Sequence, residues 1–322
     1  MKAIVQDEYG SADDVLELKE IDKPVVKDDD VLVRVHAVAL HAGDALMLRG
    51  VPYLMRPVIG LLKPKNRVPG TDMAGHVEAV GKNVKQIQPG DEVFGTCNGA
   101  CAEFACARED KFVIKPANLT FEQASAITTS AATALHGLRD AGKIQPGQKV
   151  LIIGASGGVG TFAVQIAKSF GAEVTGMCST RNVDMVRSIG ADHVIDYTQE
   201  DFTKSGERYD LIIDIAGNRS LSHLRGVLEP KGTLVLVGGS GGPWLNGLGR
   251  SIRGQVLSPF FSQRIRMFVS FPNNEDLVVL KELIESGKVT PIIERTYPLS
   301  ETPEALAYVV EGHTQGKTVI TI

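Results

Sequence analysis

Residues 149–160 read KVLIIGASGGVG, an apolar run that leads into a turn containing four glycines. The apolar run predicts a buried strand, and the residues after Gly160 predict an apolar helix. Gly154, Gly157 and Gly158 permit a tight turn and a close approach of the backbone to a pyrophosphate, which the helix N-terminus would bind. Gly160 would let the helix pack closely on the strand. The pattern is a variant of G-x-G-x-x-G and predicts a dinucleotide-binding turn; the alternative is a tight turn without a ligand.

Strands and helices alternate along the chain after this turn. We expect strands at 149–153, 173–177, 193–196, 210–215 and 233–237, a sixth near 255–257, and helices at 159–170 and 182–189. Such alternation is typical of a parallel sheet covered by helices on both faces. The predicted fold class is therefore α/β, with a Rossmann-type doubly wound parallel sheet.

The two ends of the chain have a different pattern. Short strands separated by turns, at 31–38, 75–80 and 92–94, predict a mostly β domain. Thr120 is a predicted helix N-cap. Near the C-terminus the sequence predicts a helix over 274–286, another opened by 300–304, and a last strand at 318–321.

Composition excludes several classes of protein. The chain has 322 residues and a net charge of -4, which argues against a nucleic-acid binder because such a protein needs a basic face. The first residues, MKAIVQD, lack the apolar region of a secretory signal, and no window of about 18 apolar residues predicts a membrane span. Four cysteines make no disulfide framework in a chain of this length, so we expect a cytoplasmic protein.

The residues after the second strand predict the cofactor. An NAD site usually carries an acid there for the ribose 2′-hydroxyl, but residues 177–182 read MCSTRN. The hydroxyls of Ser179 and Thr180 and the guanidinium of Arg181 suit a 2′-phosphate, which favours NADPH over NADH. The alternative is that a hydroxyl caps the next helix and Arg181 is an ordinary surface charge.

The cysteines and histidines do not form a recognisable metal motif. Cys97, Cys101 and Cys106 lack C-x2-C pairs, and the last two fall in one apparent strand at a separation that predicts opposite faces. Cys178 is expected to line an adenosine pocket or pack in the core. Asp44 is expected to cap a helix over 45–49; the alternative is a catalytic role together with His41.

Several motifs together resemble one superfamily. They are PGTDMAG at 69–75, Val80-Gly81, PGDEV at 89–93, AEF at 102–104, the glycine turn, GADHVIDY at 190–197 and GHTQGK at 312–317. The chain thereby resembles the medium-chain dehydrogenase/reductase superfamily, in its zinc-independent quinone oxidoreductase and alkenal/enone reductase branch. CSTRN and GHTQGK are similar to chloroplast-envelope quinone oxidoreductase homologues and their bacterial relatives.

The resemblance implies a domain organisation and a site without metal. It implies a GroES-like, mostly β substrate domain at 1–122, a Rossmann NADPH-binding domain at 123–262, and a return at 263–322 that completes the substrate domain. Zinc members carry a cysteine where His41 stands, Gly-His-Glu at residues 70–72, and a third cysteine near residues 129–130. The expected metal is therefore none.

The resemblance also implies roles for single residues. The expected cofactor contacts are Ser156, Gly157, Gly158 and Val159 for the pyrophosphate, Ser179 and Arg181 for the 2′-phosphate, Tyr197 for the adenosine, and Thr133, Ala216, Gly217, Val237, Gly238, Phe260 and Phe261 for the nicotinamide. Lys317 is expected to reach the cofactor from the substrate domain.

The expected reaction is hydride transfer from NADPH to a quinone or an α,β-unsaturated carbonyl, which is already activated by conjugation. Tyr53 is a candidate proton donor or substrate-positioning residue; the alternatives are a packed aromatic and protonation by water. The alternative functions are a metal-free alcohol dehydrogenase and a non-catalytic, crystallin-like NADPH-binding protein.

Two segments and the edge strands of the sheet are candidate surfaces for binding a substrate, a membrane or a second subunit. Residues 47–69 and 238–266 are expected to form lids over an apolar substrate or to touch a membrane surface; the alternative is a subunit contact and an ordinary loop. A homodimer is expected through the edge strands of the parallel sheets.

Overall fold

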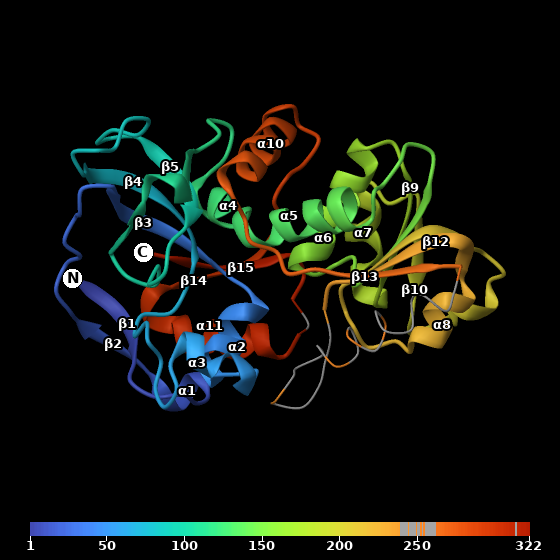
Figure 1. Cartoon of the computed structure of the whole chain (residues 1–322), viewed down its shortest axis with the longest axis horizontal. Coiled ribbons are helices and arrows are strands. Elements are labelled where there is room, and N and C mark those ends of the chain that lie inside the picture. The colour runs from blue at the N-terminus through green and yellow to red at the C-terminus, as the bar shows by residue number, and fades with distance from the viewer. Residues whose placement is uncertain (239–243, 245–248, 250–251, 253, 255–261, 313) are drawn as a thin grey trace. The chain divides into compact units, whose positions relative to one another are not determined.

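The computed structural model describes residues 1–238, 244, 249, 252, 254, 262–312 and 314–322. The chain divides into two compact units (Figure 1). The first unit comprises 1–130, 272–286 and 291–322, and the second comprises 131–271 and 287–290. The chain thus leaves the first unit at residue 130 and returns at residue 272, whereas the motifs place these boundaries at 122 and 263.

The second unit contains a parallel sheet of six strands. Its order is β10-β9-β8-β11-β12-β13, with β8 at Lys149–Ile153, β9 at Glu173–Cys178, β10 at His193–Asp196, β11 at Tyr209–Asp214, β12 at Leu228–Leu236 and β13 at Arg264–Met267. Every neighbouring pair is parallel. The chain order reverses between β8 and β11, where open sheets of this type bind ligands. The predicted doubly wound sheet is confirmed.

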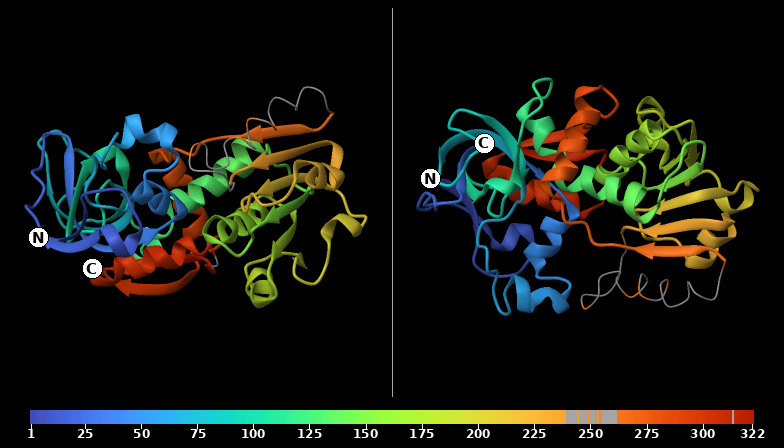
Figure 2. Two further views of the ribbon diagram at one scale, coloured as in Figure 1. Left: turned by 90° about the horizontal axis from the view of Figure 1, so that it is seen from below. Right: turned by 45° about the horizontal axis from the view of Figure 1, so that its top comes forward.

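The sixth strand differs from the expected one. It is β13, at the edge of the sheet (Figure 2), and the stretch expected at 255–257 lies outside the described residues. In β13 only Ile265 is buried, and its two arginines are exposed. This pattern fits an edge strand, whereas the central strands are continuous apolar runs.

Short helices connect these strands. They are α5 (Thr128–Leu135), which spans the unit boundary, η3 (His136–Ala141), α6 (Gly158–Ser169), η4 (Thr180–Asn182), α7 (Val183–Ser188), η5 (Phe202–Lys204) and α8 (Leu221–Gly226). The core of this unit is an apolar cluster that includes Leu151, Ile212 and Leu234.

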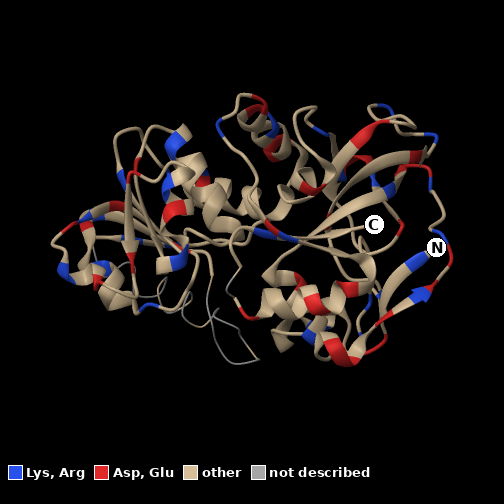
Figure 3. Cartoon of the chain, turned by 180° about the vertical axis from the view of Figure 1, so that it is seen from behind, with Lys and Arg blue, Asp and Glu red and all other residues tan. Residues whose placement is uncertain are grey.

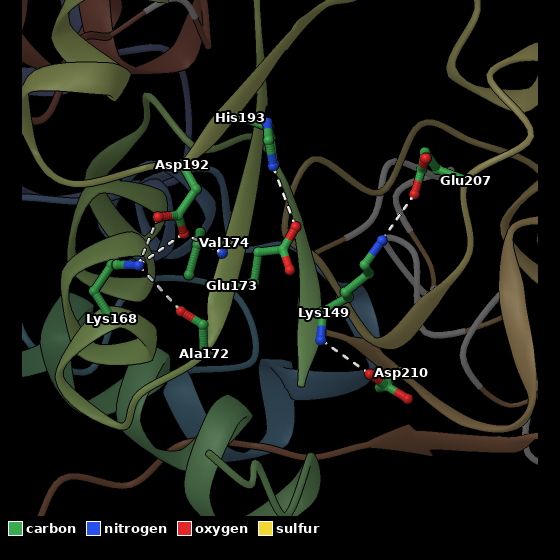
Figure 4. A network of polar contacts seen from close by, with 9 residues as sticks. All are labelled: Lys149, Lys168, Ala172, Glu173, Val174, Asp192, His193, Glu207 and Asp210. Atoms are coloured by element: carbon green, nitrogen blue, oxygen red, sulfur yellow. Dashed lines mark hydrogen bonds and ion pairs between the residues drawn. The ribbon is translucent and has the colours of Figure 1, made fainter. Parts of the chain in front are cut away.

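An ion pair between Lys168 and Asp192 connects α6 to the sheet at the surface (Figure 4). Lys168 Nζ on α6 lies 2.7 and 2.8 Å from the two carboxylate oxygens of Asp192 and donates to the carbonyl of Ala172. The same carboxylate accepts the N–H of Val174 in β9 at 2.7 Å. Asp192 therefore links α6, β9 and the start of β10.

The first unit contains a mostly antiparallel sheet of seven strands. Its order is β14-β15-β3-β4-β5-β7, and β6 also pairs with β3. The strands are β3 (Asp30–Leu40), β4 (Asp72–Val80), β5 (Glu92–Thr96), β6 (Phe104–Arg108), β7 (Phe112–Ile114), β14 (Ile293–Pro298) and β15 (Lys317–Thr321). A separate hairpin pairs β1 (Lys2–Gln6) with β2 (Leu16–Glu20). The returning C-terminal segment thus completes the β domain, and the predicted GroES-like class is confirmed.

Helices surround this sheet. They are α1 (Ala12–Val15), α2 (Ala42–Arg49), η1 (Tyr53–Met55), α3 (Arg56–Ile59), η2 (Glu109–Lys111), α4 (Phe121–Ser125), α10 (Asn274–Glu285), η7 (Leu299–Glu301) and α11 (Thr302–Val310). Thr120 caps α4 as predicted, in a capping box with Gln123. The prediction for α2 was wrong by three residues: His41 is the N-cap, and Asp44 completes its capping box.

Charged residues of both signs are spread over the surface, and no described helix is suited to span a membrane. Figure 3 shows Lys and Arg interspersed with Asp and Glu over each unit, in keeping with the net charge of -4. Among the described helices, none combines the length and apolar character needed to span a bilayer.

Candidate functional site

The glycine-rich turn joins β8 to α6 in the second unit. Gly154 has a φ of 87°, and the N–H groups of Gly154 and Ala155 donate to the Met177 carbonyl of β9 at 3.2 and 3.1 Å. Gly160 lies where helix and turn meet, because a Cβ there would overlap the Gly154 carbonyl and come within 2.7 Å of Ala155 C. Within the described chain no side chain caps α6. The N–H groups of its first turn therefore suit an anion.

Three polar side chains meet at the carboxyl ends of β8 and β9. Ser156 follows β8, Ser179 follows β9, and both are half-buried. Asn182 Nδ2 donates to Ser156 Oγ at 3.0 Å and to Ser179 Oγ at 3.3 Å. Asn182 was predicted only as the first residue of the helix at 182–189. An amide this close to two predicted ligand residues was the signal available for a binding role.

An acid lies near this group on the adjacent strand. Asp196 ends β10 and accepts the hydroxyl of Thr198 at 2.7 Å, and Thr198 is also bonded to Thr180. A hydrogen bond from Thr180 is the largest cause that lowers the pKa of Asp196. The dinucleotide-binding pattern places such an acid only after β9, so Asp196 was not expected near the ribose. Thr180 is therefore held toward Asp196, while Arg181 is exposed beside it.

Other predicted cofactor residues lie at the same end of the sheet. Tyr197 follows β10 and is 46% exposed, with the Arg219 guanidinium 5.7 Å from its ring centroid. Gly217 follows β11, and its N–H donates to the carboxylate of the buried Asp214, the last residue of that strand, at 3.0 Å. Gly238 follows β12, where a Cβ would overlap the Ile215 carbonyl oxygen. Ala216 and Val237 adjoin these glycines, Thr133 lies on α5, and Phe260 and Phe261 lie outside the described residues.

A second polar group lies in the first unit, around the N-terminus of α2. The N–H of Asp44 donates to His41 Nδ1 at 3.2 Å, so the ring proton of His41 lies on Nε2. Nε2 is 3.0 Å from Thr71 Oγ1 and donates to it. The Thr71 hydroxyl hydrogen is then available to another acceptor. Burial raises the pKa of Asp44, and His41 opposes that effect.

This group borders a cavity of about 500 Å³. Asp44 and Thr71 lie in its wall together with apolar side chains such as Leu48, Val58 and Val68. The wall also contains polar side chains, among them Gln6, Lys65 and Asn98. A cavity that combines apolar walls with polar groups is typical of a binding site for a small organic molecule. Tyr53 is not among the lining residues of the described chain; it lies in η1, where the Arg56 guanidinium is 4.5 Å from its ring centroid.

Lys317 is buried in the first unit. Its side chain is 2% exposed, and Nζ donates to Ser130 Oγ at 3.0 Å. Burial lowers the pKa of Lys317, while the carboxylates of Asp72 and Asp44 oppose that effect. Asp72 is fully buried and accepts the hydroxyl and the N–H of Thr129 at 2.6 and 2.9 Å. The predicted contact of Lys317 with a cofactor stays a prediction.

The resemblance implies that zinc ligands would stand near His41, at residues 70–72 and near residues 129–130. The His41 Nε2 proton and the Asp72 carboxylate are engaged by Thr71 and Thr129, and the remaining positions offer hydroxyls. Among the described residues, no three His, Cys, Asp or Glu side chains gather in a metal-binding group. This donor set does not fit a catalytic zinc ion.

The cysteines are reduced and mostly buried. The expected strand holding Cys101 and Cys106 was wrong: β6 begins at Phe104, and Cys101 is buried in the preceding turn. Burial raises the pKa of Cys97 to about 12 and that of Cys178 to about 11. Cys178 is 1% exposed at the end of β9 and packs in the core. Such thiols are poor nucleophiles.

Comparison with known proteins gives the family. A model described as alcohol dehydrogenase GroES-like domain matches residues 27–167, and one described as zinc-binding dehydrogenase matches 189–320. The 2-methylene-furan-3-one reductase of Solanum lycopersicum is 34% identical, with 99% of this chain and 79% of that protein covered. The chain belongs to the medium-chain dehydrogenase/reductase superfamily. The predicted resemblance is thereby confirmed.

Further relatives place the chain within the superfamily. The NADPH-dependent alkenal/one oxidoreductase of Arabidopsis thaliana, a chloroplastic protein, is 33% identical over 99% of this chain and 79% of that protein. The structure of Escherichia coli quinone oxidoreductase complexed with NADPH superimposes with a TM-score of 0.84, at 26% identity over 100% of both chains. This member of the medium-chain superfamily falls in the branch of quinone and alkenal/enone oxidoreductases.

Proposed function

We propose that this protein transfers hydride from NADPH to the electron-poor carbon of a quinone or an α,β-unsaturated carbonyl, without a metal ion. The observation that carries the cofactor assignment is the group of hydroxyls and free N–H donors at the carboxyl ends of β8 and β9, beside the exposed Arg181. It supports an anionic ligand with a pyrophosphate and a second phosphate. Bound NADPH would supply the hydride at the nicotinamide C4.

The residues of the first unit would orient the acceptor. The Thr71 hydroxyl, fixed by His41 Nε2, would donate to a carbonyl oxygen in the cavity and stabilise the negative charge that develops there. The apolar wall would exclude water and hold a planar substrate. Conjugation already activates such acceptors, so no Lewis acid is needed at the position that Thr71 occupies.

Oxidation of NADPH and NADH with an ortho-quinone, a para-quinone and a short enone, with chelator present, tests this proposal. We expect turnover with NADPH that chelator does not reduce. The variant Arg181→Ala should raise KM for NADPH about tenfold and leave KM for NADH unchanged, since one charged contact to the 2′-phosphate is lost. If the unaltered protein prefers NADH, Asp196 would instead be the residue that accepts a hydrogen bond from the ribose 2′-hydroxyl.

Two other outcomes would replace this function. Turnover of a secondary alcohol in the presence of chelator, with no reduction of quinones or enones, would identify a metal-free alcohol dehydrogenase. Tight NADPH binding with no oxidation by any acceptor would identify a non-catalytic binding protein.

We also propose peripheral contact with a membrane carrying apolar acceptors. Residues 54–62 expose Leu54, Val58, Leu61 and Leu62 by 63 to 87%, and Lys63 and Lys65 follow directly. Apolar side chains beside lysines suit an anionic lipid surface. Co-sedimentation with vesicles containing anionic lipid, reduced by Leu62→Asp and by salt, is the expected result. Equal recovery with and without vesicles would contradict it.

A further inference from the structure

Asn182 ties the pyrophosphate turn to the loop after β9. Its side-chain amide bonds both Ser156 and Ser179, and only 4% of the residue is exposed. Its Oδ1 is buried and has no hydrogen-bond partner among the described residues. A buried oxygen without a partner destabilises a fold, and such a group calls for an explanation in function.

The two hydrogen bonds that the amide nitrogen makes indicate what that function is. Nδ2 carries two hydrogens, and each is given to one serine oxygen. A hydroxyl that accepts from an amide must direct its own hydrogen elsewhere. The structure records no acceptor for either hydroxyl within the described residues, so two O–H donors remain at the carboxyl ends of adjacent strands.

We infer that Asn182 is a positioning residue that presets both hydroxyls as donors to phosphate oxygens. Ser156 would donate to the pyrophosphate and Ser179 to the 2′-phosphate, so that one amide couples the two anionic parts of the dinucleotide. This inference rests on the proposed NADPH function and adds a residue that contributes to specificity by positioning the hydroxyls. An acceptor in place of the amide would turn both hydrogens inward and remove the preference for NADPH.

A double-mutant cycle measured by calorimetry tests the inference. Three probes are used: adenosine 2′,5′-bisphosphate, which carries the 2′-phosphate but no pyrophosphate, ADP-ribose, which carries only the pyrophosphate, and NADPH. Asn182→Ala should weaken the bisphosphate and ADP-ribose about tenfold each. In Ser179→Ala protein the same change should weaken the bisphosphate less than about twofold, because the hydroxyl that it positions is gone.

Two further variants keep the result interpretable. Asn182→Asp keeps the shape of the side chain and offers only acceptors, so it should weaken the bisphosphate more than Asn182→Ala. Ser188→Ala removes an exposed hydroxyl on α7 that donates to the Met185 carbonyl, and it should leave all three affinities unchanged. Thermal melts establish that each variant folds.

The outcomes separate this inference from the proposed function. If the unaltered protein prefers NADPH but Asn182→Ala and Ser179→Ala act additively, Asn182 affects only the fold and the inference is overturned. If Asn182→Asp binds the bisphosphate as tightly as the unaltered protein, it is overturned as well. If the unaltered protein binds NADH more tightly than NADPH, the cofactor assignment itself fails.

Discussion

Gly160 is the position in the cofactor turn at which the surroundings leave no room for a side chain. Its added Cβ would collide with backbone atoms of Gly154 and Ala155, which cannot rotate away. At Gly157, three residues earlier, the nearest atom would be 3.7 Å away, an ordinary contact distance. Two glycines of one turn therefore differ in the reason for their presence.

We expect Gly160→Ala to lower the free energy of unfolding by about 1–3 kcal/mol, because helix α6 must shift away from the turn. Gly157→Ala is the matched control and should stay within about 0.5 kcal/mol. Urea unfolding followed by circular dichroism measures both. Equal losses for the two variants would show that the close packing at Gly160 is not what the turn requires.

The buried charge of Lys317 gives a second prediction at this scale. Lys317→Met removes the buried cation whose charge interacts with the carboxylates of Asp44 and Asp72, so we expect a loss of about 1–3 kcal/mol in the free energy of unfolding. Ser130→Ala removes only one hydrogen bond and should cost about 1 kcal/mol. Denaturant titration measures the free energy of unfolding of both variants. An unchanged value for Lys317→Met would mean that the ammonium group does not stabilise these carboxylates.

Elements are joined through Asp192, which connects α6, β9 and β10. Burial raises the pKa of its carboxyl, but the hydrogen bonds from Lys168 and the Val174 N–H outweigh that effect and the pKa is lowered. A carboxylate with a lowered pKa contributes stability above its unfolded value near 3.8, and the contribution disappears as pH falls through the folded pKa.

Asp192→Asn should therefore reduce stability at pH 7 and have a progressively smaller effect as the pH falls below 3.8 and through the lowered pKa of the folded carboxyl. Stability measured from pH 2 to 7 for both proteins gives the difference directly. A difference that does not change with pH would show that the ion pair with Lys168 contributes nothing. Asp184→Asn, fully exposed on α7, is the matched control.

The sequence predicted the buried central strand best. The strand at 149–153 is matched residue for residue, because an apolar run between turns leaves few alternatives. The strand at 193–196 is matched as well, although it lies at the opposite edge of the sheet from β13 and none of its residues is buried; there the flanking turns set its bounds. The edge strand β13 alternates Ile265 with exposed arginines and has no such run. The apolar residues around Cys101 resemble a strand, yet a turn precedes Phe104.

The candidate site was predictable to the same extent. Glycines and hydroxyls near strand ends identified the cofactor turn, since backbone geometry dictates those residue types. Asn182 and Asp196 were missed as partners, and His41 was considered only together with Asp44 and not with Thr71. These roles depend on contacts between segments far apart or on side-chain direction, which spacing does not encode.

At the scale of the whole molecule, β13 is the last strand at one edge of the parallel sheet among the described residues. Val269 and Phe271, just beyond this strand, are 64% and 77% exposed. We propose that a second copy of the chain covers this edge. Light scattering should report a dimer for the unaltered protein and a monomer for the double variant Val269→Asp with Phe271→Asp. A monomer in both cases would contradict the proposal.

The strand β15 lies between β14 and β3, inside the sheet of the first unit. On the ribosome, β3 emerges early but must wait for residues 317–321 before that neighbour exists, and by then the whole second unit has left the exit tunnel. The part of the protein synthesised first is thus the part completed last. β4 and β6 can already pair with β3 during synthesis, so only residues 37–40 lack their partner on the side of β15. Hydrogen-exchange labelling during synthesis should find β8 protected before these four residues.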